Sequence, residues 1–262
     1  MLLWQLTQGH SPLIVNVPHA GRHVPDALAL RMDPRALALH DTDWHVDALY
    51  RFAPATGATF VVATHSRYVV DLNRDPSGAP LYPGADNTEL CPTRTFANEP
   101  VYRDGEAPAQ SEIAAREVTY FAPYHALLAQ QIERVRSRHG YALLLDGHSI
   151  AAEVPRFFAG RLPDLNLGTV DGRSCGASVQ TLATRVLAQA NGFTHVVNGR
   201  FKGGYITRHF GAPGRGVHAL QLEMAQACYM DESQPAALDA ARAAPLVALL
   251  ERLVIALSEW RA

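Results

Sequence analysis

Cysteine is scarce in this sequence, and its few positions are widely separated. There are 3 cysteines among 262 residues, without the close spacing that binds structural zinc. An odd, scattered set is typical of reduced thiols, so we expect a cytoplasmic protein without disulfide bonds. No histidine lies at a spacing that indicates a thiol nucleophile. The three residues are Cys91, Cys175 and Cys228.

An excess of charge of one sign and long apolar runs are also missing. The 23 Lys and Arg residues against 25 Asp and Glu residues leave a net charge of −2, which argues against a nucleic-acid partner. Charges or prolines interrupt the apolar stretches before they reach the length of a bilayer span, and no basic and apolar leader opens the chain, so we expect no membrane segment. Ser149 lacks the Gly-x-Ser-x-Gly turn of many serine hydrolases.

The apolar residues that are present form short runs separated by helical patterns. Six runs rich in Val, Leu and Ile predict buried strands at 13–17, 58–63, 68–71, 141–146, 195–198 and 217–223. Helical spacing predicts helices over 44–52, 124–138, 179–187 and 246–257, the last with Pro245 at its start. This alternation predicts an α/β fold of three layers with a mostly parallel sheet, in a single domain over residues 1–262. The Pro- and Gly-rich stretch 76–108 is expected to be a long surface loop that shapes an active site.

Groups that bind metals or activate water follow three of the expected strands. His19 and His148 come after two strands, and Glu223 ends a third. Chemistry in open α/β sheets collects at the carboxyl ends of buried strands, so two imidazoles and a carboxylate there indicate a metallohydrolase. Asp146 lies on the same side as His148 and could accept its ring proton. The alternatives are a His19 ring bonded to its own turn, Asp146 in a plain turn, and a Glu223 that faces solvent.

Polar groups around a fourth run indicate the class of substrate. Asn73 and Arg74 follow the run, Arg67 precedes it, and Arg208 lies beside a Gly-Gly pair that permits close approach. Arginine binds carboxylates through two parallel hydrogen bonds, so these residues favour a small acidic substrate. The alternative for Arg74 is a local ion pair with a neighbouring aspartate.

Several separated motifs together resemble the N-formylglutamate amidohydrolase family, which is similar in turn to aspartoacylase, succinylglutamate desuccinylase and the zinc carboxypeptidases. The resemblance implies a mixed sheet flanked by helices, as in the zinc carboxypeptidases, and one zinc ion. It extends over nearly the whole chain. The motifs are Asn16-Val17-Pro18-His19-Ala20-Gly21, Asp41-Thr42-Asp43-Trp44-His45, Val70-Asp71-Leu72-Asn73-Arg74, Asp146-Gly147-His148-Ser149, Lys202-Gly203-Gly204-Tyr205 and Gln221-Leu222-Glu223-Met224.

The resemblance also implies roles for particular residues. His19 and His148 would be zinc ligands, Glu223 the general base and acid, and Asn73 with Arg74 the pair that binds a substrate carboxylate. Relatives of the family have a glutamate three residues after the first histidine, where this chain has Arg22. We expect Asp43 to supply the missing ligand, with His45 as the alternative. A helix N-cap is an equally common use of such an aspartate.

The implied activity is hydrolysis of the formamide bond of N-formyl-L-glutamate, which yields formate and L-glutamate and is the last step of a histidine degradation route. Zn²⁺, or another divalent metal, would be the cofactor, and Arg67 or Arg208 would assist Arg74 in holding the two substrate carboxylates. Two alternatives remain at this point. One is hydrolysis of another N-acyl amino acid or of a peptide C-terminus, and the other is a ligand-binding relative without catalysis. No pattern in the sequence indicates the oligomeric state.

Overall fold

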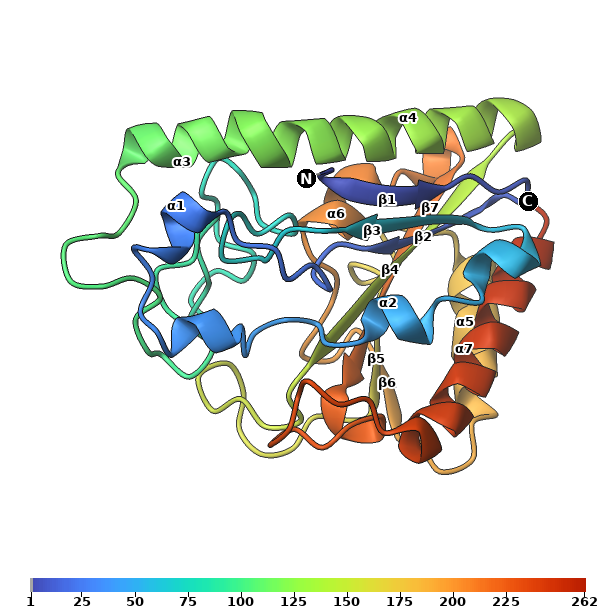
Figure 1. Ribbon diagram of the computed structural model, residues 1–262. Helices are drawn as coiled ribbons and strands as arrows, with labels where there is room; N and C mark the ends of the chain where they lie inside the picture. The colour runs from blue at the N-terminus through green and yellow to red at the C-terminus, as the bar shows by residue number, and fades with distance from the viewer. Residues whose placement is uncertain (1) are drawn as a thin grey trace.

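A seven-stranded mixed sheet runs through the centre of the molecule in a computed structural model that describes residues 2–262 (Figure 1). Its strand order is β1-β3-β2-β4-β7-β5-β6. The strands are β1 (Trp4–Thr7), β2 (Leu13–Val17), β3 (Thr59–Ala63), β4 (Ala142–Ile150), β5 (Leu165–Gly168), β6 (His195–Val197) and β7 (Val217–Ala225).

Most neighbouring strands are parallel. The pairs β3–β2, β2–β4, β4–β7 and β5–β6 are parallel, whereas β1 pairs with β3, and β5 with β7, in antiparallel fashion. The three central strands β2, β4 and β7 are buried at every residue, as expected for strands covered on both faces. The expected α/β fold with a mostly parallel mixed sheet is therefore confirmed.

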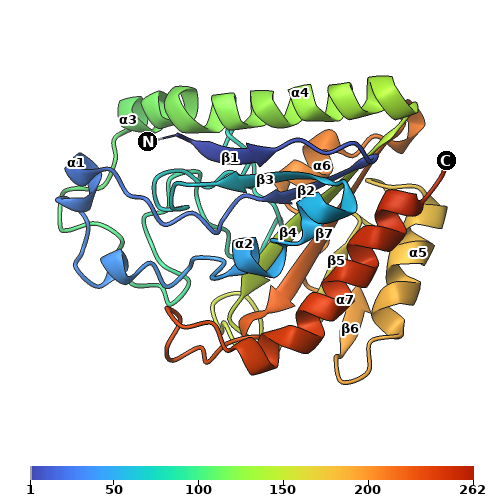
Figure 2. The same ribbon diagram turned by 45° about the vertical axis from the view of Figure 1, so that its right-hand side comes forward.

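Helices cover both faces of the sheet and complete the three layers (Figures 1 and 2). One face is covered by α4 and α6, and the other by α2, α5 and α7. The longer α-helices are α3 (Gln110–Arg116), α4 (Ala122–His139), α5 (Ala177–Ala188), α6 (Tyr205–Phe210) and α7 (Ala240–Glu259), and the short ones are α1 (Asp26–Ala29) and α2 (Val46–Leu49). None of these helices of the described chain has the length and apolarity that crossing a membrane requires.

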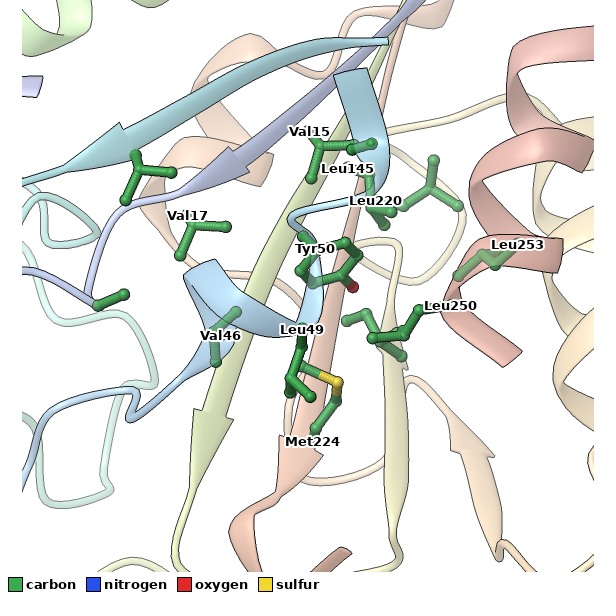
Figure 3. Close-up of a cluster of buried hydrophobic side chains, with 14 of the residues drawn as sticks. Val15, Val17, Val46, Leu49, Tyr50, Leu145, Leu220, Met224, Leu250 and Leu253 are labelled. Carbon is green, nitrogen blue, oxygen red and sulfur yellow. The ribbon is translucent and has the colours of Figure 1, made fainter. Parts of the chain in front are cut away.

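The larger core lies between the sheet and the layer of α2 and α7 (Figure 3). Val15, Leu145 and Leu220 point to this face from neighbouring strands, while Leu49 and Leu250 meet them from the two helices. Alternate residues of the same strands point the other way, toward α4 and α6. The polar residues at the ends of β4 and β7 share this second face.

Three expectations about local structure are wrong. No strand forms over 68–71; residues 67–69 form a turn instead, because the backbone carbonyl and hydroxyl of Ser66 accept hydrogen bonds from the following amides. The helix expected over 44–52 is limited to α2, since His45 has a left-handed backbone (φ 61°) that a helix cannot contain. The last helix begins before Pro245, at Ala240, because the side chain of Asp239 caps two of its amides.

Two short strands, β1 and β5, lie outside the expected runs. β1 is half-exposed at the edge of the sheet, and β5 contains an asparagine and a glycine, so neither has an apolar run of the usual length. The stretch 76–108 contains no helix or strand among the described elements, as the sequence predicted.

Candidate active site

The carboxyl ends of β2, β4 and β7 lie side by side and carry the polar residues singled out above. His148 and Glu223 are register partners on adjacent parallel strands and point to the same face of the sheet. His19 lies two residues after the end of β2, and its backbone carbonyl accepts a hydrogen bond of 3.0 Å from the amide of Asp43. This bond ties the loop before α2 to the end of β2. Residues from four distant parts of the chain therefore meet at one edge of the sheet.

The two histidines have the same kind of environment. Nε2 of His19 lies 2.8 Å from Oδ1 of Asp71, and Nε2 of His148 lies 2.9 Å from Oδ2 of Asp146. The opposite ring nitrogens, Nδ1, lie 3.8 Å and 2.9 Å from the same oxygen of Asp43. Each ring is therefore held by an aspartate on one side and directs its other nitrogen toward Asp43.

These three residues form a buried group that could hold a metal ion. One ligand atom from each of His19, Asp43 and His148 lies within 4.8 Å of the others. Two imidazole nitrogens and a carboxylate oxygen are ligands that zinc prefers, and a ligating imidazole usually donates its other ring N–H to a carboxylate. Oδ1 of Asp43 is buried without a hydrogen-bond partner among the described residues. This oxygen is available to coordinate a metal ion, so the residues present fit a divalent metal.

The ionisation of the histidines differs because their surroundings differ. Burial, reinforced by the positive charge of Arg67, lowers the pKa of His19. Burial also acts to lower the pKa of His148, but Asp146 and Asp43 outweigh it and raise this pKa well above the ordinary value. In the metal-free protein these opposite directions favour a protonated ring at His148, between two carboxylates, and a neutral ring at His19.

Arg67 lies inside this cluster. Its Nη2 donates to Nδ1 of His19 over 2.6 Å and lies 3.3 Å from Oδ2 of Asp71, while Nη1 is 3.6 Å from Oδ1 of Asp43. The guanidinium also packs over the ring of Phe96, at 4.9 Å from its centroid. Arg67 neutralises two of the buried aspartates, and a metal bound at Nδ1 of His19 would displace its contact with that nitrogen.

Glu223 is nearly buried beside the cluster and faces the same pocket. Its Oε2 accepts a hydrogen bond of 3.1 Å from the side chain of Gln221. Burial is the largest influence on the carboxyl group and raises its pKa to about 7. A carboxylate with a pKa near neutrality can both accept and return a proton, which is the property that a general base and acid needs.

Asn73 is fixed between α6 and the cluster. Its Oδ1 accepts a hydrogen bond of 2.8 Å from the amide of Ile206, and its Nδ2 lies 3.1 Å from Nε2 of His148. Gly204 makes this approach possible, since a Cβ at that position would lie 2.2 Å from Nδ2 of Asn73. The amide of Gly204 in turn donates to Gln221 over 2.7 Å.

A pocket opens over the cluster and is lined by groups of both charges. The arginines at its wall are Arg67, Arg74 and Arg200. Arg74 donates to the hydroxyl of Thr88 over 2.7 Å instead of forming the local ion pair with an aspartate. Arg208 lies outside this lining, in a separate hollow beside Tyr205, and its Nε donates to the carbonyl of Gly203. Of the four residues expected to bind substrate, the structure brings Arg67, Asn73 and Arg74 together.

Asp43 and His45, which the sequence left as alternatives, lie in different surroundings in the structure. The residue at the N-cap of α2 is His45, and Asp43 instead accepts from the amide of Ser149 over 3.2 Å. His45 directs Nε2 to the carbonyl of Pro235 at 2.8 Å and does not belong to the cluster. The asparagine and aspartate behind the rings, Asn16 and Asp71, were not singled out as site residues. Position in the sequence could have indicated both: Asn16 lies near the end of β2, and Asp71 lies two residues before Asn73.

Comparison with known proteins finds relatives of this chain over nearly its full length. The family model described as N-formylglutamate amidohydrolase matches residues 11–230. The chain is 44% identical over 255 residues to the N-formylglutamate deformylase of Pseudomonas putida, covering 97% of this chain and 95% of that protein. It is 45% identical over 253 residues to the N-formylglutamate deformylase of Pseudomonas aeruginosa PAO1, with coverages of 97% and 95%.

A solved structure shows the same fold over the whole chain. The crystal structure of N-formylglutamate amidohydrolase from Ralstonia eutropha JMP134 superposes with a TM-score of 0.83 at 27% identity, covering 99% of this chain and 98% of that one. Agreement in sequence over nearly the full length and agreement in fold lead to one conclusion. The chain belongs to the N-formylglutamate amidohydrolase family.

Proposed function

We propose that this protein hydrolyses N-formyl-L-glutamate to formate and L-glutamate, with a divalent metal, zinc in the first place, bound by His19, Asp43 and His148. The reaction would be the last step of a histidine degradation route. The observation that carries the proposal is the position of Glu223, a buried carboxylate whose pKa is raised to about 7, next to this donor set in one pocket. The choice of N-formyl-L-glutamate as the substrate is inferred from the names of the relatives.

The metal, when bound, would polarise the formyl carbonyl and make a water molecule more acidic. Asp71 and Asp146 accept the Nε2 protons of the two rings, which leaves the Nδ1 nitrogens available as ligands. The aspartates also fix the planes of the rings, so the donor atoms are ordered before any ligand arrives. Their role is therefore to orient His19 and His148.

Glu223 would move the proton. In its ionised form it removes a proton from the attacking water, and it then returns this proton to the departing amine nitrogen of glutamate. Formic acid and a neutral amine result, and the acid then gives its remaining proton to the amine or to water, which yields formate. Gln221 holds one oxygen of Glu223 through its amide and leaves the other free for this transfer.

The substrate carries two carboxylates, and the pocket offers positive charge to hold them. Arg74 adjoins Asn73, whose amide contacts His148, so its guanidinium is suited to the carboxylate nearest the reacting bond. Arg67, already engaged by Asp43 and Asp71, is suited to the negative oxygen that develops on the formyl group. The formyl group itself is small, so most binding energy must come from the glutamate part.

The test is an assay of formate release from N-formyl-L-glutamate by protein stripped of metal and then reloaded with zinc. We expect turnover only after reloading. N-Acetyl- and N-succinyl-L-glutamate and N-formyl-L-aspartate should be poorer substrates. Arg74→Ala should lower kcat and raise KM, with a combined loss of about 10²-fold or more in kcat/KM, because it removes both a carboxylate contact and the positioning it provides.

Each alternative predicts a different result. Faster hydrolysis of the acetyl or succinyl compound would indicate another N-acyl amino acid as the substrate. Binding of N-formylglutamate without release of formate, in wild-type protein with zinc bound, would indicate a ligand-binding protein. Near-wild-type kinetics of Arg74→Ala would contradict its role in binding substrate.

A further inference from the structure

Arg200 lies in the wall of the active-site pocket, although nothing in the sequence pattern singled it out. It belongs to the glycine-rich segment between β6 and α6, and its side chain is half-buried. Nε donates a hydrogen bond of 2.9 Å to the carbonyl of Phe157. The guanidinium also lies over the ring of Tyr82, 4.8 Å from its centroid, and 5.5 Å from that of Phe201. The side chain is therefore held in one orientation by a carbonyl and two rings.

The terminal nitrogens of Arg200 are not engaged by a carboxylate. Within residues 2–262, no ion pair shorter than 4.0 Å is formed by Arg200 or by Arg74. The neighbouring arginines differ in this respect. Arg67 is paired with Asp43 and Asp71, and Arg156 binds both oxygens of the pocket residue Asp86 at 2.8 and 3.0 Å. Arg67 at the pocket wall and Arg156 behind it are therefore neutralised within the protein, and the other two wall arginines, Arg74 and Arg200, remain available to an anion.

We propose that Arg200 binds the side-chain carboxylate of the substrate and so selects a dicarboxylate, an inference that rests on the proposed function. The two available guanidinium groups match the two carboxylates of N-formylglutamate. Arg74 lies beside Asn73 and hence near the reacting end, where the α-carboxylate is separated from the scissile nitrogen only by the α-carbon. The side-chain carboxylate extends beyond the methylene groups, and Arg200 receives it.

Because its side chain is restrained, Arg200 can discriminate between a carboxylate and a carboxamide. Because Nε is occupied by the Phe157 carbonyl, the edge formed by the two terminal nitrogens is the part that remains for a ligand. This edge matches a carboxylate with two parallel hydrogen bonds. A carboxamide of the same shape offers one acceptor and one donor, and the donor meets another donor. The site should therefore bind a carboxylate much better than the corresponding amide.

The experiment compares Arg200→Gln with the wild type on two substrates of equal shape, N-formyl-L-glutamate and N-formyl-L-glutamine. We expect Arg200→Gln to lower kcat/KM for N-formylglutamate by about 10²- to 10³-fold, as for loss of one partner of a desolvated charge pair. For N-formylglutamine the change should be less than about tenfold, since that substrate makes no charged contact with Arg200. Arg200→Lys should show an intermediate loss because lysine keeps the positive charge but lacks the edge of two terminal nitrogens.

Two further variants make the comparison specific. Arg208→Gln tests the competing assignment, since Arg208 also packs on the ring of Tyr82, at 5.5 Å, but from outside the pocket lining. Arg173→Gln is the matched control, because Arg173 likewise donates Nε to a backbone carbonyl, that of Val170 at 3.0 Å, and does not line the pocket. Arg173→Gln should leave the preference for glutamate over glutamine unchanged.

The possible outcomes separate the two proposals. Wild-type protein with metal bound that releases no formate from N-formylglutamate overturns the proposed function and the role of Arg200 with it. Wild-type turnover combined with an unchanged substrate preference in Arg200→Gln overturns the role of Arg200 alone. An equal loss on both substrates also overturns it, because damage to the fold lowers both rates while loss of a carboxylate contact lowers one. A changed preference in Arg208→Gln instead would assign the contact to Arg208.

Discussion

Nδ1 of His148 and Oδ2 of Asp43 lie 2.9 Å apart although the two residues are separated by 105 positions in the chain. The same oxygen of Asp43 accepts the amide of Ser149, and the amide of Asp43 donates to the carbonyl of His19. Asp43 therefore joins the ends of β2 and β4 and lies between the two imidazoles. The position of this carboxylate relative to the two imidazoles is therefore set by hydrogen bonds to the ends of two strands of the sheet.

The first prediction concerns the metal ligand at this position. Asp43→Asn keeps the shape of the side chain but removes its charge, so the purified protein should retain little zinc, with affinity weakened by at least about 10²-fold. His45→Gln should retain zinc as the wild type does, because His45 is directed to the Pro235 carbonyl. Metal content measured by mass spectrometry after dialysis checks both variants. Loss of zinc in His45→Gln alone would assign the ligand to His45.

The second prediction concerns the proton that His148 releases when a metal binds. Asp146 and Asp43 raise the pKa of His148 well above its ordinary value despite burial, so the metal-free ring holds a proton at neutral pH that a metal must displace. Zinc binding should therefore release a proton, and zinc affinity should increase with pH. Calorimetric titrations in buffers with different ionisation enthalpies measure this release. Equal binding enthalpies in all buffers would contradict the protonated state of His148.

The sequence predicted the parts of the site that depend on strand ends. His148 and Glu223 each end an apolar run, and the parallel register of β4 and β7 makes them neighbours. Burial of such runs follows from composition, so these positions could be found without coordinates. Their roles in metal binding and proton transfer stay predictions.

Features that depend on loops could not be predicted in the same way. Val69 and Val70 have strand-like composition, but hydrogen bonds to Ser66 form a turn, and tertiary packing buries it. The sequence analysis singled out Arg208, beside a Gly-Gly pair, and not Arg200, although Arg200 also follows a glycine. Only the course of the segment after β6 shows that Arg200 lines the pocket. Loop conformation, unlike strand burial, is decided by contacts that are distant in sequence.

The third prediction concerns Glu223. If this residue transfers the proton, Glu223→Gln should lower kcat by about 10²- to 10⁴-fold while the protein still binds zinc. For the wild type, kcat/KM should rise with pH on the acidic side, because only the ionised carboxylate can remove a proton from water. A variant that loses turnover and zinc together would instead indicate a structural role.

The same substitution should also change stability, in a direction that the pKa decides. Burial raises the pKa of Glu223 from its ordinary 4.5 to about 7, so between these values the folded protein binds a proton that the unfolded chain does not. The free energy of unfolding therefore falls as pH increases through this range. Glu223→Gln lacks this penalty. Its Tm relative to wild type, measured in EDTA, should be higher at pH 8 than at pH 5, and a constant difference would contradict the raised pKa.

The fourth prediction concerns a chain of hydrogen bonds behind the site. The hydroxyl of Tyr124 donates to Oδ1 of Asn16 over 2.7 Å, and Nδ2 of Asn16 donates to Oδ1 of Asp146 over 2.7 Å. The other oxygen of Asp146 contacts His148. Tyr124→Phe leaves the amide oxygen of Asn16 buried without its donor, so Asn16 and Asp146 lose part of their orientation. Zinc affinity should then fall by about tenfold, at the lower end of the effect of such indirect contacts.

Tyr141→Phe is the matched control for this effect. Tyr141 lies at the opposite end of β4, and its hydroxyl donates to the carbonyl of Trp260 over 2.6 Å, without connection to the metal-binding group. Both variants lose one hydrogen bond and should be destabilised by about 1 kcal/mol. Only Tyr124→Phe should bind zinc more weakly, as measured by competition with a chromophoric chelator. Equal zinc affinities in the two variants would show that Tyr124 supports the fold without positioning His148.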